Sequence, residues 1–287
     1  MELINFPIGF LDLVKLVIKD QPLAKYEAKA DGELWDRWLR IVFLGGKRSD
    51  AEVSYVLENM KSITDMEHVL KTNGEDLQIE MSKLLSRGIA AEKDEYLNEM
   101  LKEMQNEVFR IVASVKGSAR YFQKNKVSKK WLDDKTGTKD KTWELIEELV
   151  EDGDVSNIKW TKVILWFHAV GKAPDFCPPS RQVKDFVNKD IGPYYRFYED
   201  DKYFMKQMDI ITEEARKTVK AATVRDISRA AFYYRCMKGM FGGNPKLFTP
   251  KFLMLFMKKN KLTLDKLADM LADIKKKNKL FKMLNPE

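Results

Sequence analysis

Hydrophobic residues recur every three or four positions along most of this chain, the spacing that builds one buried face of a helix. The first such face is formed by Phe10, Leu13, Val14 and Val17. Similar faces follow at 34–42, 53–60, 77–85, 145–149 and 160–167, and a longer helix is predicted from about Glu92 to Val115. No segment alternates apolar and polar residues as a half-buried strand would. The sequence therefore predicts an all-α fold.

Residues that start or stop helices separate these segments. Pro22 cannot continue a helix, and Gly45-Gly46 and Gly171 are expected to end two more. Ser49 to Glu52 has the spacing of a capping box, and Thr64 to Glu67 repeats it. Further N-caps are expected at Ser180, Thr212, Thr223, Thr249 and Thr263.

The predicted architecture has two helical lobes with a basic groove between them, preceded by a helical arm. Residues 125–142 are rich in polar residues and are expected to form a loop near the lobe boundary. The expected divisions are an arm at 1–30, lobes at 31–150 and 151–260, and a lysine-rich C-terminal helix or tail at 261–287.

Composition narrows the class of protein. Hydrophobic residues make up 44% of the 287 residues, which is typical of a globular chain. No apolar run approaches the roughly 18–20 residues that span a bilayer, so no membrane insertion is expected, and no signal peptide is recognised. Two cysteines and two histidines match no zinc spacing. We expect free thiols in a reducing compartment, no metal and no cofactor.

Charge is distributed unevenly along the chain. Residues 1–110 carry a net charge of −6, residues 111–141 of +6, residues 142–158 of −6 and residues 159–287 of +13. A basic half of this kind favours a polyanionic partner, although a solvated lysine surface or head-to-tail contact with the acidic half would also fit.

No arrangement of residues indicates catalysis. The chain contains no glycine-rich phosphate loop, no His-Glu-x-x-His and no Gly-x-Ser-x-Gly. His168 lies beside Trp166 and Phe167 and is interpreted as a core histidine. The sequence therefore predicts a protein that is not an enzyme.

Basic residues interleaved with aromatic ones form three clusters. Lys116, Arg120 and Lys124 recur every four residues beside Tyr121 and Phe122. The second cluster holds Arg225 and Arg229 with Tyr233 one turn further on, and the third holds Arg181 and Lys184 at the start of a helix after Ser180. Basic groups neutralise phosphates and aromatic rings stack on bases, so these clusters predict nucleic-acid binding. Lys162 is included among the expected RNA contacts.

The first 22 residues are too apolar for a free tail. Phe6, Phe10, Leu13, Val14 and Val17 lie around a possible hinge at Pro7-Ile8-Gly9. Two interpretations remain open at this point. The segment packs on its own core, or it docks on a neighbouring copy and joins protomers into an open chain.

The order of these features resembles that of the nucleoproteins of segmented negative-strand RNA viruses, in the phlebovirus and tenuivirus group. The resemblance rests on the arm, Trp38-Leu39-Arg40, Gly45-Gly46, Asp50-Ala51, the segment Asn73 to Gly88, and Phe248-Thr249-Pro250 onward. It implies single-stranded RNA held in a groove, a homo-oligomeric ring or filament, a viral polymerase as a further partner, and a location in the virion and host cytoplasm. It also implies an RNA contact for Arg87.

Two rival classes remain. Lys162, Val170-Gly171 and Ser180-Arg181 are similar to parts of a helix-hairpin-helix DNA glycosylase, in which Lys162 would form a Schiff base with the sugar. Ser180 stands where that family has an aspartate. The other rival is a helical host-interaction protein that binds no nucleic acid.

Overall fold

The computed structural model describes residues 4–44, 50–191, 200–241 and 247–285. These residues form sixteen α-helices and one short 3-10 helix, and none of them lies in a strand. The predicted all-α class is confirmed. Two expected features lie outside the described residues: the Gly45-Gly46 turn and the Ser49 cap.

The chain divides into two compact units, and the N-terminal segment belongs to the same unit as the C-terminal half. Unit 1 contains residues 1–27 and 167–287, and unit 2 contains residues 28–166. This division differs from the expected one, because residues 1–30 are not a separate arm and the second boundary falls near residue 167 rather than residue 150.

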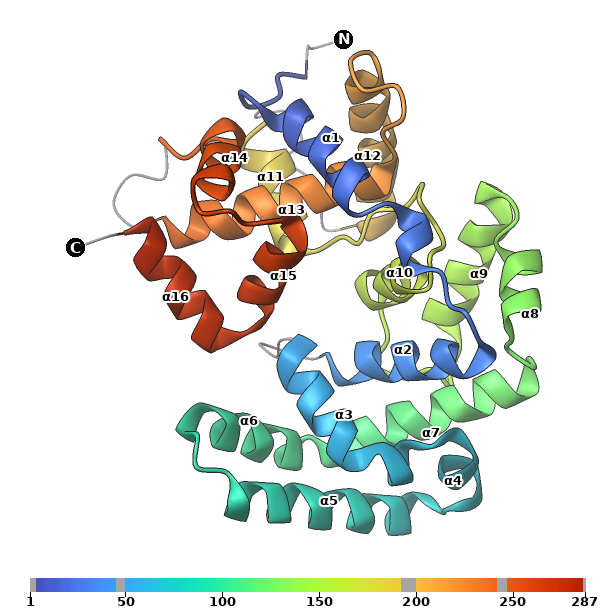
Figure 1. Cartoon of the computed structure of the whole chain (residues 1–287). Helices are drawn as coiled ribbons and strands as arrows, with labels where there is room; N and C mark the ends of the chain where they lie inside the picture. The colour runs from blue at the N-terminus through green and yellow to red at the C-terminus, as the bar shows by residue number, and fades with distance from the viewer. Residues whose placement is uncertain (1–3, 45–49, 192–199, 242–246, 286–287) are drawn as a thin grey trace. The chain divides into compact units, whose positions relative to one another are not determined.

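Unit 2 is built from helices that follow one another along the chain. They are α2 (Asp31–Phe43), α3 (Asp50–Thr64), α4 (Met66–Lys71), α5 (Gly74–Ala91), α6 (Glu95–Asn106), α7 (Val108–Lys124), α8 (Lys129–Lys135), α9 (Lys139–Glu151) and most of α10 (Trp160–Ala169). In Figure 1, α5 and α6 run as an antiparallel pair in this unit. Its core holds three aromatic side chains in contact: the ring centre of Trp38 lies 5.0 Å from that of Trp166, in an edge-on arrangement, and 5.6 Å from that of Phe122.

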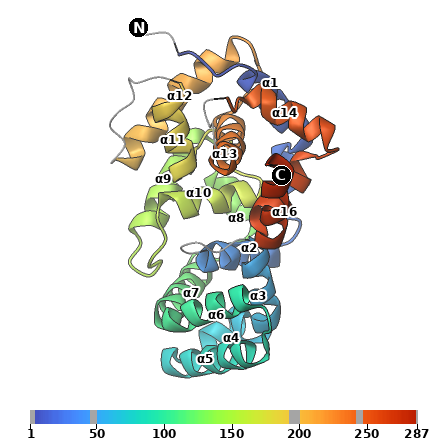
Figure 2. The same ribbon diagram turned by 90° about the vertical axis from the view of Figure 1, so that its left-hand side faces the viewer.

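Unit 1 is arranged around α13 (Val224–Met240), which α1, α11, α12 and α14 surround (Figures 1 and 2). Its elements are α1 (Phe10–Asp20), η1 (Leu23–Tyr26), the end of α10, α11 (Arg181–Lys189), α12 (Asp201–Arg216), α13, α14 (Pro250–Lys259), α15 (Leu264–Ala272) and α16 (Ile274–Leu284). Helix α1 contacts α13, α14 and α15, so the first helix of the chain completes a core made by the last ones.

Helix α1 packs on its own core. Phe10, Leu13, Val14 and Val17 have no solvent-exposed surface, and the ring of Phe10 lies 4.5 Å from that of Phe186 and 5.4 Å from that of half-buried Phe6. Each such side chain stabilises the fold by about 1.5–3 kcal/mol. Of the two open interpretations, this structure therefore supports packing on the protein's own core, and docking on a neighbouring copy is wrong for it.

The expected hinge at Pro7-Ile8-Gly9 is a fixed turn. The backbone N–H of Lys251 donates to the carbonyl oxygen of Ile8 at 3.1 Å. Gly9 has a φ of +84°, and a Cβ atom there would lie 2.8 Å from the backbone of Lys251. Glycine is required at this position because both the backbone conformation and the close approach of α14 exclude a side chain.

Most of the predicted helix caps are present. The hydroxyl oxygens of Ser180, Thr223, Thr249 and Thr263 each accept a backbone N–H of the following helix. Thr212 is a wrong prediction: it lies inside α12 and its hydroxyl donates to the carbonyl of Met208. Helix α4 is capped by Asp65 rather than by Thr64.

Two segment predictions are also wrong. Residues 125–142 are not a polar loop, because Ser128 and Thr138 cap helices α8 and α9 within them. The single helix expected from Glu92 to Val115 is two helices, which break at Glu107.

Within the described residues, no helix is long and apolar enough to cross a membrane. Nor does any group of three or more histidine, cysteine, aspartate or glutamate side chains in that part of the chain have the geometry of a metal site.

Candidate nucleic-acid interface

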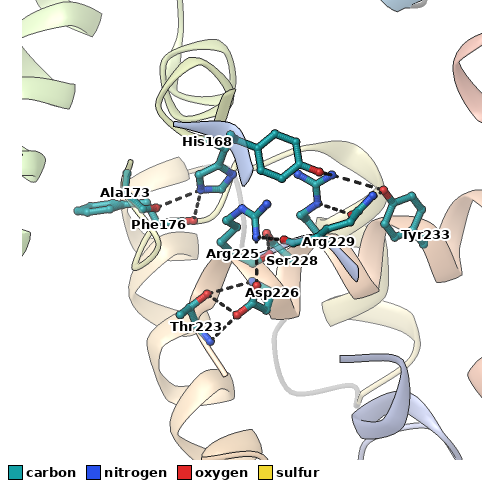
Figure 3. Close-up of polar contacts among 11 residues, drawn as sticks. His168, Ala173, Phe176, Thr223, Arg225, Asp226, Ser228, Arg229 and Tyr233 are labelled. Atoms are coloured by element: carbon teal, nitrogen blue, oxygen red, sulfur yellow. Dashed lines mark hydrogen bonds and ion pairs between the residues drawn. The ribbon is translucent and has the colours of Figure 1, made fainter. Parts of the chain in front are cut away.

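The predicted Arg225 cluster is a buried polar network within unit 1 (Figure 3). Arg225 lies on α13 and has no exposed surface. One of its terminal nitrogens, Nη1, donates to the carbonyl oxygen of Gln21 at 3.0 Å and to Asp226 Oδ1 at 3.2 Å. Its guanidinium lies 5.1 Å from the centre of the Tyr26 ring. Nε and Nη2 have no hydrogen-bond partner.

The prediction that Arg225 faces an RNA groove is therefore wrong for this structure. A fully buried guanidinium cannot reach a phosphate unless the core opens. Burial and the neighbouring Arg229 lower the pKa of Arg225, and Asp226 and Tyr26 partly offset them. This arginine connects α13 to the end of α1 and to η1.

Arg229 occupies the next turn of α13 and is half-buried. Its Nε donates to Gln21 Oε1 at 3.1 Å, and its Nη2 lies 3.3 Å from the Tyr26 hydroxyl and 3.4 Å from that of Tyr233. Tyr233 is 3% exposed and donates its hydroxyl to the same Gln21 oxygen. Its ring is thus unavailable for base stacking, which corrects a second prediction.

His168 is a core histidine, as predicted. Its Nε2 lies 3.1 Å from the carbonyl oxygens of both Ala173 and Phe176, so the neutral ring carries its proton on Nε2 and donates it to them (Figure 3). Burial, and after it the charges of Arg225 and Arg229, lower the pKa of His168 to about 3. It is a structural donor, with no exposed face for substrate.

Gln21 and Tyr26 organise this network, and sequence reasoning missed both. Gln21 is 1% exposed, and its backbone carbonyl, its side-chain oxygen and its side-chain amide contact Arg225, Arg229 and Asp265 respectively. The only signal is their position on either side of Pro22, in the segment that leaves α1. A glutamine and a tyrosine in such a segment are read as surface residues unless the fold is known.

The cluster on α7 is divided between the solvent and the core of unit 2. Lys116 is half-buried and donates to the carbonyl oxygens of Val69, at 3.0 Å, and of Thr72, at the end of α4. Burial, with a contribution from Arg120, lowers its pKa. Arg120 is exposed but pairs with Asp154 at 3.2 Å. Only Lys124 is exposed with no ion pair to a described residue.

The two aromatic residues of this cluster are core residues. Tyr121 is 2% exposed and its hydroxyl donates to Glu148 at 2.7 Å. Phe122 is 4% exposed and packs against Trp35, at 5.3 Å, and Trp38. Their predicted role in stacking on RNA bases is wrong for this fold, because both rings are covered.

The remaining predicted contacts are scattered. Arg87 is exposed on α5, and Arg181 is exposed at the first turn of α11. Lys184 forms a 2.6 Å ion pair with Asp201. Lys162 donates to the carbonyl oxygen of Val42 at 3.1 Å. Arg87 and Lys162 belong to unit 2, whereas Arg181 and Lys184 belong to unit 1.

Exposed lysines are instead concentrated at the C-terminal end of unit 1. Residues 250–284 hold ten lysines and three aspartates, a net charge of +7, which equals the net charge of the whole chain. Helix α16 contributes five of these lysines and no acid, and all five are exposed. Helix α16 lies in the expected lysine-rich segment at 261–287, none of whose residues is among the predicted RNA contacts.

On α16 three of the five lysines lie opposite the buried face. Leu280 and Leu284 pack into the core of unit 1. Lys275, Lys279 and Lys282 follow one another at i, i+4 and i+7, so they lie about 6 and 4.5 Å apart along the outer side of the helix. Phe281 is 46% exposed and directly precedes Lys282. These four residues are named the α16 lysine surface below.

Comparisons of the chain with protein families, with characterised proteins and with solved structures found no match.

Proposed function

We propose that this protein binds the phosphate backbone of a nucleic acid through the α16 lysine surface. The observation that carries the proposal is an exposed row of lysines on a helix without acids, within a segment of net charge +7. Ammonium groups in a row neutralise successive phosphates and release counterions, which is the main source of sequence-independent affinity.

Single-stranded RNA is the ligand that we propose. Phe281 is half-exposed and projects about 100° around the helix from Lys282, at the edge of the lysine row. An exposed ring stacks on any unpaired base whatever its identity. The sequence contains no recognised base-reading motif. Together these features favour an unpaired strand bound with little sequence preference.

Because the order of motifs resembles that of viral nucleoproteins, we extend this proposal to a viral nucleoprotein that coats genomic RNA. That role would place the protein in the virion and the host cytoplasm, as a homo-oligomer on RNA near a viral polymerase. Backbone binding does not depend on this extension, because it rests on the charge and exposure of α16 alone. Linkage of protomers through α1 is not part of the proposal, since that helix is buried.

The experiment compares two variants of equal charge change. In the first, Lys275, Lys279 and Lys282 are changed to Gln; in the matched control, the exposed unit 2 residues Lys61, Lys83 and Lys93 are changed to Gln. Binding of a fluorescent 20-nucleotide oligouridine is measured by anisotropy at several salt concentrations. The first variant should reduce the slope of log K against log salt by about 2, because three contacts to a single strand contribute about 0.7 each.

The control variant should retain the wild-type slope. Equal losses in both variants would mean that only net charge matters. An unchanged slope in the α16 variant would exclude α16 as the contact surface, and salt-independent binding by the wild type would contradict backbone recognition altogether.

The alternative is the glycosylase-like enzyme with Lys162 as nucleophile. A Schiff base requires an unprotonated amine with access to the sugar, whereas Lys162 is half-buried and hydrogen-bonded to the carbonyl of Val42. Ser180 caps α11 through its hydroxyl. This alternative therefore ranks second, and borohydride trapping of a covalent adduct with abasic DNA tests it directly.

A further inference from the structure

A second feature of unit 1 is a group of large apolar side chains on its surface around α14. Ile8 is 72% exposed, Leu247 69%, Leu255 57% and Phe252 36%. They are neighbours in space: the backbone of Ile8 is hydrogen-bonded to that of Lys251, and Leu247 precedes Phe248, whose ring lies 5.1 Å from that of Phe252.

These apolar residues are part of a well-anchored surface. Phe248 is 1% exposed, and its carbonyl oxygen accepts the hydroxyl of Tyr234 on α13. Leu253 and Phe256, on the inner side of α14, lie in the core of unit 1. The outward side chains are thus held in position by the buried face of the same helix.

Lysines surround the apolar group. The exposed positions of α14 include Lys251, Lys258 and Lys259, which lie on the same helix face as Phe252 and Leu255. No ion pair joins these three lysines to a described residue, and the sequence holds no aspartate or glutamate from Phe241 to Leu264. The α14 patch is defined as these residues with their two neighbours, namely Ile8, Leu247, Lys251, Phe252, Leu255, Lys258 and Lys259.

We propose that the α14 patch binds the surface of an anionic lipid bilayer. Exposed aliphatic side chains flanked by lysines without acids suit the boundary between headgroups and acyl chains, where apolar burial and attraction to anionic lipid act together. The aliphatic residues give this patch a different chemistry from that of the α16 lysine surface, because Ile8, Leu247 and Leu255 have no ring to stack on a base. Binding of this kind is peripheral and needs no spanning helix.

The test is co-sedimentation of the full chain with vesicles of phosphatidylcholine alone or with 30% phosphatidylserine. Wild-type protein should sediment with the anionic vesicles and remain in solution with the neutral ones. Changing Ile8, Leu247 and Leu255 to Ser should reduce the partition coefficient by roughly tenfold or more, since about 0.8 kcal/mol is lost for each buried CH₂. Changing Lys258 and Lys259 to Gln should also reduce it by roughly tenfold or more.

A matched control changes apolar residues that are equally exposed elsewhere. Ile79 and Phe109 of unit 2 are 49% and 70% exposed, and their change to Ser should leave vesicle binding unchanged. The proposal is overturned if wild-type protein ignores anionic vesicles, or if the control variant loses as much binding as the patch variant. It is also overturned if the Ser variant keeps vesicle binding but loses affinity for oligouridine, which would assign the patch to nucleic acid.

Discussion

Replacing Arg225 tests directly whether this arginine is a structural or a nucleic-acid-binding residue. Two variants are informative. Arg225→Ala removes the whole side chain, and Arg225→Met keeps most of its volume while removing its charge. The residue is among the largest fully buried side chains of the protein, and two of its three guanidinium nitrogens have no partner.

The two substitutions should differ in their cost. The Ala variant leaves a cavity beneath Tyr26 and removes the donor to Gln21, so the free energy of unfolding should fall by about 3–5 kcal/mol. The Met variant loses the same hydrogen bond, at about 1–3 kcal/mol, but it fills the space and relieves the desolvation of an incompletely paired charge. Its net cost should be about 1–2 kcal/mol.

Urea unfolding followed by far-ultraviolet circular dichroism measures this difference. With an m value of about 2–3 kcal/mol/M, the two unfolding midpoints should lie roughly 1 M apart. Binding of oligouridine by the folded Met variant should equal that of the wild type. Equal destabilisation by Met and Ala would refute the packing argument, and a stable Met variant that no longer binds RNA would show that the guanidinium contacts the ligand.

Three further predictions concern both units. Changing Gly117 to Ala should destabilise unit 2 by about 3 kcal/mol or more, because a Cβ atom there would lie 1.6 Å from the carbonyl oxygen of Asp154. The control is Gly74→Ala, where no atom lies within 4 Å of the added Cβ, and thermal unfolding compares the two variants. Changing Lys116 to Met should lower the unfolding free energy by about 1–2 kcal/mol in urea titrations, because two carbonyl oxygens at the end of α4 lose their donor. Unit 1 should lose stability as the pH falls from about 6.5 to about 3, because the unfolded chain protonates His168 in this window while the folded unit, with the pKa of His168 lowered to about 3, does not. In a His168→Gln variant, the amide can still donate to the carbonyls of Ala173 and Phe176. This variant should reduce the change of unfolding free energy with pH by up to about 1.4 kcal/mol per pH unit. If the urea midpoint of the variant changes with pH as that of the wild type does, this prediction is contradicted.

Helix identity and much of the core followed from the sequence, because both depend on local periodicity. The predicted face of α1, formed by Phe10, Leu13, Val14 and Val17, is fully buried, and four of the predicted caps form hydrogen bonds of the expected kind. Helix α8 and the first turn of α9 were missed, since their polar composition resembles a loop and only the caps Ser128 and Thr138 mark them; the apolar face of α9 at 145–149 was predicted.

The predicted RNA contacts were wrong where helical spacing alone was used to infer that a side chain is exposed. Arg225 and Arg229 share a helix face, but that face is turned toward the core, and the small or apolar neighbours Ile227, Ala230 and Ala231 are also fully buried. A helix with apolar residues on every side is a central helix, so its basic residues are more safely interpreted as buried. That pattern was visible in the sequence, whereas the partners Gln21 and Tyr26 were not, because they come from a segment two hundred residues away.

The location of the net charge explains why both proposed surfaces lie at the C-terminal end. Outside residues 250–284 the chain holds equal numbers of basic and acidic residues, 41 of each, and many basic side chains there have structural roles. Arg235, for example, pairs with the nearly buried Asp190 at 3.0 Å. Removing lysines from α14 or α16 should therefore weaken attraction to any polyanion, whether RNA or lipid. Only the aliphatic residues Ile8, Leu247 and Leu255 distinguish the two, since their removal affects insertion into a bilayer without changing charge.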